Sequence, residues 1–146
     1  MIVRFVRGDL FLSSAQTLSN PINCRAVMGG GLALEFRSRF PEMSQDYVQR
    51  CRRGEVRVGK PYVWRNLSGP FVLNFPTKDD WRDPSKLEHI EEGLRYLVDH
   101  CRPMGLTSLA LPALGCGLGG LEWRVVRPVM ERELSHLDIP VETYEP

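Results

Sequence analysis

A glycine-rich stretch, Leu114–Leu121, constrains the fold of this chain more than any other feature. It follows the apolar run Ser108–Pro112, which is typical of a buried strand, and it precedes residues 123–137, which have a helical pattern. Glycine lets a ligand approach the backbone closely, and a helix N-terminus offers unpaired N–H groups and partial positive charge. The pattern predicts a phosphate-binding turn, although taken alone it fits a tight surface turn equally well.

A second glycine-rich turn, Gly29–Gly31, occurs in the same kind of setting near the N-terminus. It lies between the extended segment Thr17–Ile22 and the helical run Gly31–Arg39. Neither turn continues into the Gly-Lys-Ser/Thr of a Walker A loop, and neither has the context of a dinucleotide-binding fingerprint. Two such turns in one chain predict a pocket that holds a pyrophosphate from two sides.

Length and composition fit one domain spanning residues 1–146. The chain is 42% hydrophobic and 25% charged, which is ordinary for a soluble globular protein. Its net charge of +1 argues neither for nor against a polyanionic partner. Residues 37–65 contain eight basic and three acidic residues, a net charge of +5. That segment fits either a face for a nucleic acid backbone or a solvated helix face and hairpin.

The four cysteines are scattered and form no C-x-x-C pair, which argues against a zinc site and against a disulfide framework. We therefore expect reduced thiols, no metal and a cytoplasmic protein. The N-terminal sequence lacks the pattern of a signal peptide, and no apolar run approaches the roughly 20 residues of a membrane span. No association with a membrane is expected.

Extended and helical patterns alternate along the chain. Strands are expected at residues 2–6, 17–22, 61–64, 71–75, 108–112 and 141–144, and helices at 31–39, from 41 to before 54, from 87 to before 105, and at 123–137. Ser85-x-x-Glu88 has the form of a capping box for the third helix, and the last strand is expected at a sheet edge. This order predicts an α/β sandwich around a largely parallel sheet.

Polar and glycine residues follow several of the expected strands directly. They are Asp9, Asn23, Gly29–Gly31, Lys78 and Gly115–Gly120. Ligands of such sheets bind at the carboxyl ends of the strands, so we expect these residues to meet at one rim and to bind a nucleotide-like ligand.

Several motifs together resemble the macrodomain family, whose members bind ADP-ribose. In chain order they are Gly8–Phe11, Asn20–Cys24, Met28–Phe36, Asn74–Lys78 and Pro112–Trp123. The resemblance covers nearly the whole chain and implies a single macrodomain with a three-layer α/β/α fold and a central mixed, largely parallel sheet. The Asn-Phe-Pro-Thr-Lys and Gly-Cys-Gly-Leu-Gly-Gly-Leu elements point to the branch of DNA ADP-ribosyl glycohydrolase antitoxins (DarG), which is related to the terminal ADP-ribose glycohydrolases of animals.

The resemblance implies a role for each motif. Asp9 would accept a hydrogen bond from the adenine amino group, with the Leu10 N–H on the ring. Asn23 would bind the hydroxyls of the distal ribose. The other implied ligand-binding residues are Gly29, Gly30, Gly31 and Leu32 near the distal ribose, Thr77, and Gly115, Cys116, Gly117, Leu118 and Gly119 around the pyrophosphate.

Lys78 is the implied catalytic residue. Its amine would stand at the anomeric carbon, where the neutral form attacks this carbon or the ring-opened aldehyde and the charged form stabilises a leaving base anion. A surface lysine in a polar loop is the alternative from the residues alone. Trp81 and Arg82 are expected to contact DNA, the first by stacking on the modified nucleotide and the second by pairing with it. A tryptophan packed under its own loop is equally consistent with the sequence.

Two positions depart from the family pattern. Gly119 stands where the related animal enzyme has an acidic residue, so a lysine–acid pair is not expected here. Gly30 stands where the family often has a lysine, and its glycine removes a charge near the distal ribose.

The resemblance implies hydrolysis of the bond between ADP-ribose and a nucleobase of single-stranded DNA. ADP-ribose would be the ligand and product, no cofactor would be required, and the chain would act as a monomeric antitoxin against a DarT-like toxin. Three alternatives stay open. They are removal of ADP-ribose from protein glutamate, deacetylation of O-acetyl-ADP-ribose, and binding of ADP-ribose without catalysis.

Overall fold

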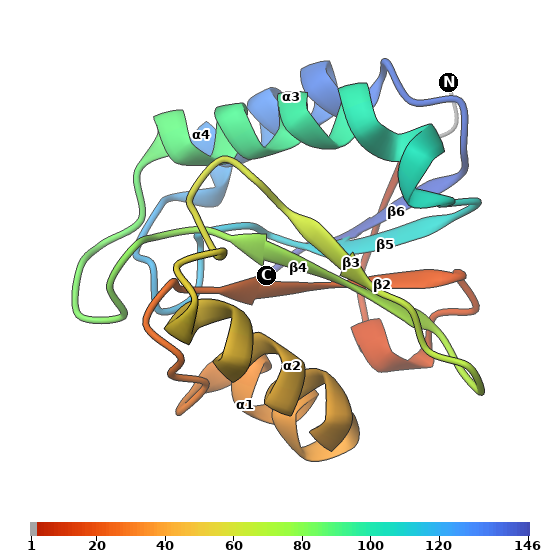
Figure 1. Cartoon of the computed structure of the whole chain (residues 1–146). Helices are drawn as coiled ribbons and strands as arrows, with labels where there is room; N and C mark the ends of the chain where they lie inside the picture. The colour runs from red at the N-terminus through yellow and green to blue at the C-terminus, as the bar shows by residue number, and fades with distance from the viewer. Residues whose placement is uncertain (1–2) are drawn as a thin grey trace.

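A six-stranded sheet runs through the middle of the molecule, and helices cover both of its faces (Figure 1). The computed structural model describes residues 3–146. The elements in chain order are β1 (Val3–Val6), the 3₁₀ helix η1 (Leu10–Leu12), β2 (Thr17–Ile22), α1 (Gly31–Arg39), α2 (Pro41–Arg52), β3 (Tyr62–Trp64), β4 (Phe71–Pro76), α3 (Leu87–Met104), β5 (Leu109–Pro112), α4 (Trp123–Leu134) and β6 (Val141–Tyr144).

The strand order is β1-β6-β5-β2-β4-β3. Every neighbouring pair is parallel except β3 and β4, which are antiparallel. Helices α3 and α4 lie on one face of the sheet, and α1 and α2 lie on the other (Figure 1). The three-layer α/β/α fold with a mixed, mostly parallel sheet is therefore confirmed.

The position of β6 corrects one expectation. This strand lies between β1 and β5 rather than at an edge, with Val141 opposite both Val3 and Leu109. Its alternate residues Val141 and Thr143, which point to one face of the sheet, are 1% and 0% exposed, and Val141 packs in the apolar cluster that α3 and α4 cover. β1 takes the edge instead. Ile2, the expected first residue of β1, lies outside the described residues.

The ends of two helices also differ from the sequence prediction. Lys86 is the N-cap of α3 and its side chain makes no capping hydrogen bond, so Ser85 and Glu88 do not form the expected capping box. Helix α4 ends at Leu134, three residues early. Beyond it, the N–H groups of His136 and Leu137 bond to carbonyls only three residues back, at 3.2 and 3.0 Å, which makes a tighter turn than an α-helix.

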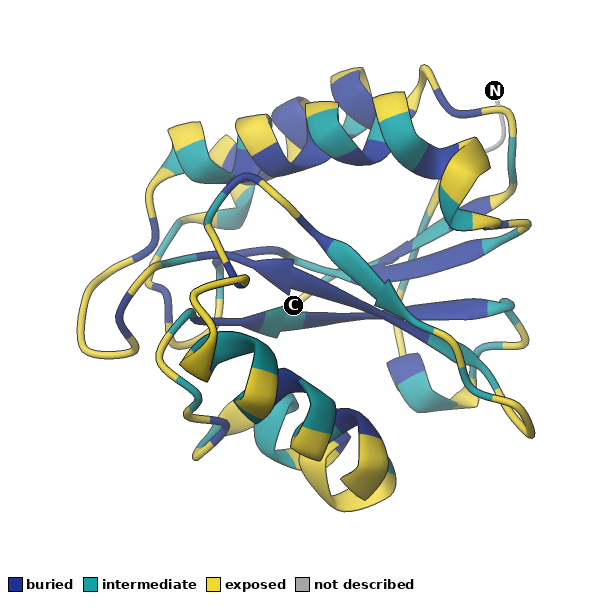
Figure 2. Ribbon diagram, in the orientation of Figure 1, coloured by how far each residue is buried: buried dark blue, intermediate teal, exposed yellow. Residues whose placement is uncertain are grey.

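Two buried apolar clusters hold the layers together. Alternation along the strands sends Leu73 and Phe75 of β4 towards α3 and α4, and sends Val72 towards α1 and α2. Figure 2 shows the buried residues concentrated in the strands and on the helix faces that turn to the sheet. Gly93 of α3 packs on the ring of Phe75, where an added Cβ would lie 2.5 Å from the nearest ring carbon. None of the helices within residues 3–146 is long and apolar enough to cross a membrane.

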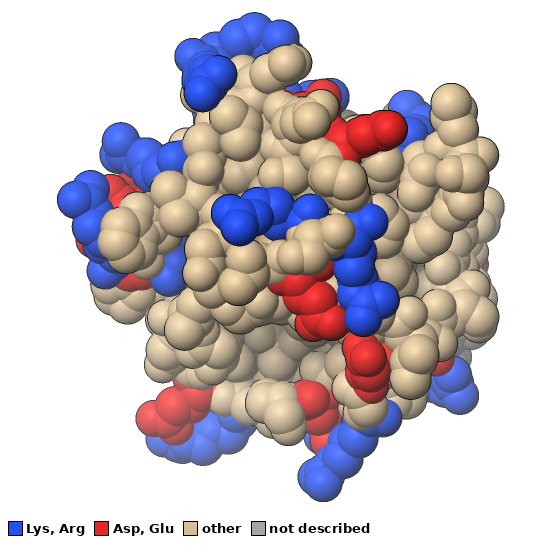
Figure 3. Space-filling model, turned by 90° about the horizontal axis from the view of Figure 1, so that it is seen from below, with Lys and Arg blue, Asp and Glu red and all other residues tan. Residues whose placement is uncertain are grey.

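The basic segment at residues 37–65 does not form one continuous patch. Viewed from below, on the side where α1 and α2 lie, the basic side chains stand in separate groups with acidic side chains among them (Figure 3). Three ion pairs account for part of this mixing: Arg39–Glu35 at 3.0 Å, Arg50–Asp46 at 2.8 Å and Arg53–Glu55 at 2.6 Å. The arrangement favours the solvated helix face over a nucleic acid surface.

Candidate functional site

A cavity of about 1080 Å³ opens at the carboxyl ends of the parallel strands. Small-molecule and cofactor sites span roughly 300–1,000 Å³, so it is large enough for a dinucleotide-sized ligand. Fifteen of the expected site residues line its wall: Asp9, Leu10, Asn23, Gly29, Gly30, Gly31, Leu32, Thr77, Lys78, Trp81, Gly115, Cys116, Gly117, Leu118 and Gly119. Arg82 is the one expected site residue that is not part of it.

The loop after β5 presents free backbone donors. Gly115 adopts a φ of 76°, a conformation that favours glycine, and its carbonyl accepts a hydrogen bond from the Leu121 N–H at 2.9 Å, which closes the loop on itself. Within residues 3–146, the N–H groups of Gly117, Leu118 and Gly119 donate to no protein acceptor. Unpaired N–H groups on a cavity wall attract an anion such as a phosphate.

The Gly29–Gly31 turn forms the facing wall and leads directly into α1. Gly30 is the N-cap of α1 with extended backbone, and Gly31 has a φ of 57°. A Cβ on Gly30 would lie 3.1 Å from Cδ1 of Leu118. The two glycine turns therefore touch across the mouth of the cavity, and the N-terminus of α1 adds partial positive charge beside it.

Asp9 lines the cavity, and one of its carboxylate oxygens already accepts a hydrogen bond from the protein. As the N-cap of η1, it accepts a hydrogen bond from the Phe11 N–H at 2.9 Å. Asp9 therefore also stabilises this turn, and its second carboxylate oxygen stays available to a ligand.

The C-terminal residues are a part of the wall that sequence reasoning missed. Tyr144, Glu145 and Pro146 line the cavity together with Asp9. The Glu145 carboxylate is held by Arg127 at 2.8 Å and by Arg7 at 3.2 Å. This part of the wall depends on the strand order: β6 lies between β1 and β5, so its carboxyl end lies beside theirs at the cavity.

Asn23 is 7% exposed and is largely committed to its own loop. Its Oδ1 accepts hydrogen bonds from the Arg25 N–H at 2.9 Å and the Tyr47 hydroxyl at 3.0 Å, and its Nδ2 donates to the Val27 carbonyl at 2.7 Å. One Nδ2 proton remains for a ligand. Tyr47 is fully buried, and its hydroxyl holds Asn23 in this position.

Lys78 lines the cavity, and hydrogen bonds of the residues on either side of it fix its backbone. Just before it, the Thr77 N–H bonds to the Ile22 carbonyl at 2.9 Å; just after it, the Asp79 carbonyl accepts from the Cys24 N–H at 2.8 Å. Its side chain lines the cavity, and Lys78 forms no ion pair with any residue of the described chain. The side chain is therefore available to a ligand, unlike a lysine in a solvated surface pair.

Trp81 and Arg82 have different surroundings. Trp81 lines the cavity and is 52% exposed, so it is not packed under its own loop. The Arg82 guanidinium bonds both oxygens of Asp80, at 3.0 and 2.6 Å, and holds the pKa of that carboxyl well below its usual range. Arg25 pairs with Asp79 at 2.9 Å next to it. Arg82, the arginine expected to contact DNA, is therefore already paired with a carboxylate of its own loop.

Cys116 lines the cavity, Cys24 lies beside the cavity residue Asn23, and both thiols have raised pKa values. Burial raises the pKa of Cys116 to about 11, and burial reinforced by the Asp79 carboxylate raises that of Cys24 to about 12. Thiolate is the nucleophilic form, so neither is suited to attack at neutral pH. All four cysteines are free, and no three metal-ligating side chains gather anywhere in residues 3–146.

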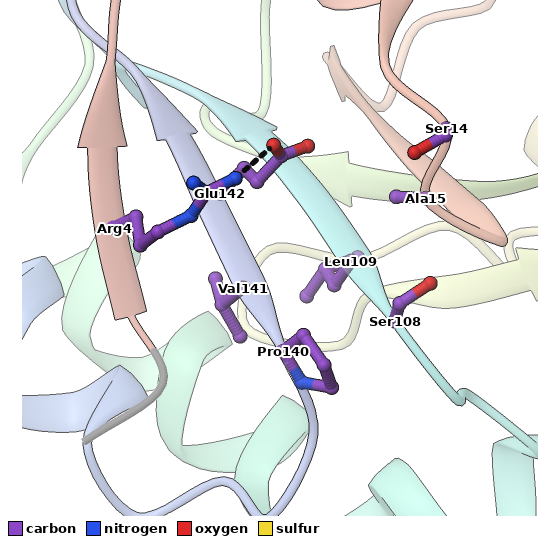
Figure 4. A pocket seen from close by; sticks show the side chains of 8 residues that line it. All are labelled: Arg4, Ser14, Ala15, Ser108, Leu109, Pro140, Val141 and Glu142. Atoms are coloured by element: carbon purple, nitrogen blue, oxygen red, sulfur yellow. Dashed lines mark hydrogen bonds and ion pairs between the residues drawn. The ribbon is translucent and has the colours of Figure 1, made fainter.

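A smaller hollow of about 180 Å³ lies at the other end of the strands, where β5 and β6 begin (Figure 4). Ser108 and Pro140, which precede β5 and β6, line it, and an ion pair of 2.8 Å joins Arg4 to Glu142 beside it. Its volume is below the usual range for a small-molecule site. The chemistry-bearing residues all lie at the other end of the strands.

The model of the Macro domain family matches residues 19–130, which is most of the chain. The chain belongs to the macrodomain family. This macrodomain is 42% identical to the DNA ADP-ribosyl glycohydrolase of Thermus aquaticus over 149 residues, a match that covers 99% of the chain and 41% of that protein. The chain spans about two fifths of the length of the curated relatives it matches.

Two solved structures share both fold and sequence with this macrodomain. The macrodomain of Mycobacterium tuberculosis DarG superposes with a TM-score of 0.94 at 41% identity, covering 99% of this chain and 97% of that one. Thermosipho africanus DarTG, solved in complex with ADP-ribose, superposes with a TM-score of 0.95 at 41% identity, covering 99% of this chain and 41% of that one.

Proposed function

We propose that this macrodomain hydrolyses the bond between ADP-ribose and a nucleobase of single-stranded DNA. One observation carries the proposal: Lys78 lies on the wall of the same cavity as Asp9 and both glycine turns. The names of the relatives that share 40–42% of its residues support it, since they are DNA ADP-ribosyl glycohydrolases. The DarTG fusion among them supports a DarT-like DNA ADP-ribosyltransferase as the opposing toxin.

The wall suggests how ADP-ribose would lie. Adenine would reach Asp9, where the free carboxylate oxygen accepts from its amino group and the Leu10 backbone faces the ring. The diphosphate would take the free N–H groups of residues 117–119. The distal ribose would then lie beside the Gly29–Gly31 turn, with the remaining Nδ2 proton of Asn23 and the side chain of Thr77 in the same wall.

Lys78 would act at the anomeric carbon of that ribose. It is the one lysine or arginine among the described residues that line the cavity. A neutral amine would displace the base from the anomeric carbon, so that the bond from this carbon to the base breaks as the bond to the lysine nitrogen forms. The adduct would open to an imine, which water would hydrolyse to release the ribose and restore the amine. A charged amine would instead stabilise the departing base anion. In both cases the net reaction adds water, with its hydroxyl on the anomeric carbon and its proton on the base.

The base would leave the cavity past Trp81, whose exposed ring offers a stacking surface. Removal of ADP-ribose from protein glutamate, deacetylation of O-acetyl-ADP-ribose, and ADP-ribose binding without turnover need the same cavity. They differ in whether Lys78 is required and in which bond, if any, is broken.

Release of ADP-ribose from DNA modified at thymine or at guanine tests this proposal, with wild type compared to Lys78→Ala. Wild type should release ADP-ribose, and Lys78→Ala should bind free ADP-ribose without releasing it. Lys60→Ala, an exposed lysine away from the cavity, is the matched control and should retain full activity. Release at the parent rate by Lys78→Ala would remove the assigned role of Lys78. Turnover of modified protein or of O-acetyl-ADP-ribose alone would favour the corresponding alternative.

A further inference from the structure

Ser85 lies behind the glycine loop, outside the cavity wall. It is 5% exposed, and its backbone N–H donates to the Gly119 carbonyl at 2.9 Å. The sequence assigned its side chain to a capping box, but α3 begins without a side-chain cap. The Ser85 hydroxyl therefore does not cap α3.

The loop has a packed side and an open side, and Ser85 forms the packed side. A Cβ on Gly115 would lie 3.2 Å from Cβ of Ser85, and a Cβ on Gly119 would lie 2.9 Å from the same atom with the Ser85 Oγ closer still. By contrast, a Cβ on Gly117 would have no atom within 4 Å. Contact with Ser85 therefore holds Gly115 and Gly119 at the back and leaves the residues between them facing the cavity.

The Ser85 Oγ is buried and has no hydrogen-bond partner among residues 3–146. Buried hydroxyls are normally paired, and an unpaired one is unfavourable. An acceptor is nearby. A Cβ added to Gly119 would lie 2.6 Å from the Gly115 carbonyl oxygen and would also be close to the Ser85 Oγ, so both oxygens lie near the same point. That carbonyl uses one lone pair for the Leu121 N–H and has a second available.

We propose that Ser85 is a positioning residue of the diphosphate-binding loop, and that its hydroxyl bonds to the Gly115 carbonyl when the loop closes on a diphosphate. The inference rests on the proposed binding of ADP-ribose by this loop. The hydrogen bond from Ser85 to Gly115 forms only in the ligand-bound protein. Its free energy therefore contributes to ligand affinity and not to the stability of the ligand-free protein.

If this hydrogen bond forms only with ligand, Ser85→Ala should weaken diphosphate binding without lowering the stability of the ligand-free protein. Dissociation constants for ADP-ribose, ADP and adenosine are measured by calorimetry, and the Tm of the ligand-free protein by thermal unfolding. Binding of ADP-ribose and ADP should weaken about tenfold, while binding of adenosine stays unchanged because it has no diphosphate. The ligand-free Tm should stay the same or rise, because the variant removes an unpaired buried hydroxyl.

Ser19→Ala is the matched control. Ser19 is fully buried on β2 and its Oγ also lacks a partner in the described chain, but it lies outside the cavity wall. Its replacement should leave the affinity for ADP-ribose unchanged. If Ser85→Ala folds poorly, Ser85→Cys keeps a similar shape with a weaker donor and should still weaken ADP-ribose binding selectively.

Two results would overturn the role of Ser85. One is unchanged ADP-ribose affinity in Ser85→Ala. The other is a lower Tm together with equal losses for ADP-ribose and adenosine, which would mark a structural role only. A wild type that does not bind ADP-ribose would instead overturn the proposed function, and the inference with it, so the two failures are distinguishable.

Discussion

Leu118 and Gly30 meet across the mouth of the cavity, with Cδ1 of Leu118 lying 3.1 Å from the position of a Cβ on Gly30. Leu118 is 76% exposed, so most of its surface remains open to a ligand or to solvent. The contact brings together two turns that are more than 80 residues apart in sequence. The width of the cavity at this point therefore depends on both residues.

Gly30→Val should weaken ADP-ribose binding, because its side chain displaces Leu118 into the opening. Gly30 has a φ of −157°, extended backbone that valine adopts, so the Tm should change little. Leu118→Ala in the Gly30→Val background should restore affinity. Calorimetry on the double-mutant cycle should give a coupling free energy of about 0.5–3 kcal/mol, the usual range for residues in contact. Additive effects would mean that the contact does not control entry.

Asp9→Ala should reduce affinity for ADP-ribose by about tenfold or more, because a hydrogen bond to a charged group contributes about 1.5–3 kcal/mol. The same change removes the N-cap of η1 and should lower the free energy of unfolding by about 1 kcal/mol. Asp9→Ser, which keeps a capping oxygen on a shorter side chain, separates the two effects. It should recover stability without recovering affinity, as measured by urea unfolding and calorimetry.

Trp81→Ala should raise the KM for ADP-ribosylated single-stranded DNA by about 5- to 100-fold, since stacking on one base is worth about 1–3 kcal/mol. Affinity for free ADP-ribose should change much less, because that ligand has no base beyond the distal ribose. Arg82→Ala is the comparison. Because Asp80 already engages this guanidinium, its loss should affect KM less than loss of Trp81. An equal effect of both variants would contradict this division of roles.

The buried thiol of Cys24 should make the protein less stable at alkaline pH. Its pKa is raised to about 12 in the folded protein from an ordinary value of 9.0, so between these values the unfolded chain releases a proton that the folded chain retains. Stability is therefore present below pH 9 and falls as pH rises towards 12. Between pH 9.5 and 11, wild type should lose up to about 2 kcal/mol more than Cys24→Ala in urea unfolding under reducing conditions. Parallel pH profiles of the two proteins would contradict this.

The cavity wall was predictable because it depends on the order of elements. Lys78 and both glycine turns each follow a parallel strand, and such strands end on the same side of a sheet. Gly115 and Gly31 have positive φ in the structure, so glycine at those turns is a local requirement that the sequence expresses directly. Residues of this kind can be assigned to a rim before any long-range packing is known.

Residues whose role depends on a distant neighbour could not be assigned in this way. Ser85 carries the local signature of a capping box, yet its backbone bonds to Gly119, 34 residues later. Tyr144 lines the cavity because β6 lies inside the sheet, and strand order is a property of the whole chain.

The interior position of β6 has a consequence for how the protein forms as it is synthesised. Among the strands of this sheet, β1 is synthesised before the others and its neighbour β6 after them, so β1 cannot pair in the sheet until residues 141–144 leave the ribosome. The wall that carries Tyr144 is completed in the same step. A nascent chain that stops short of residue 141 would thus leave its N-terminal strand unpaired and its ligand cavity open along one side.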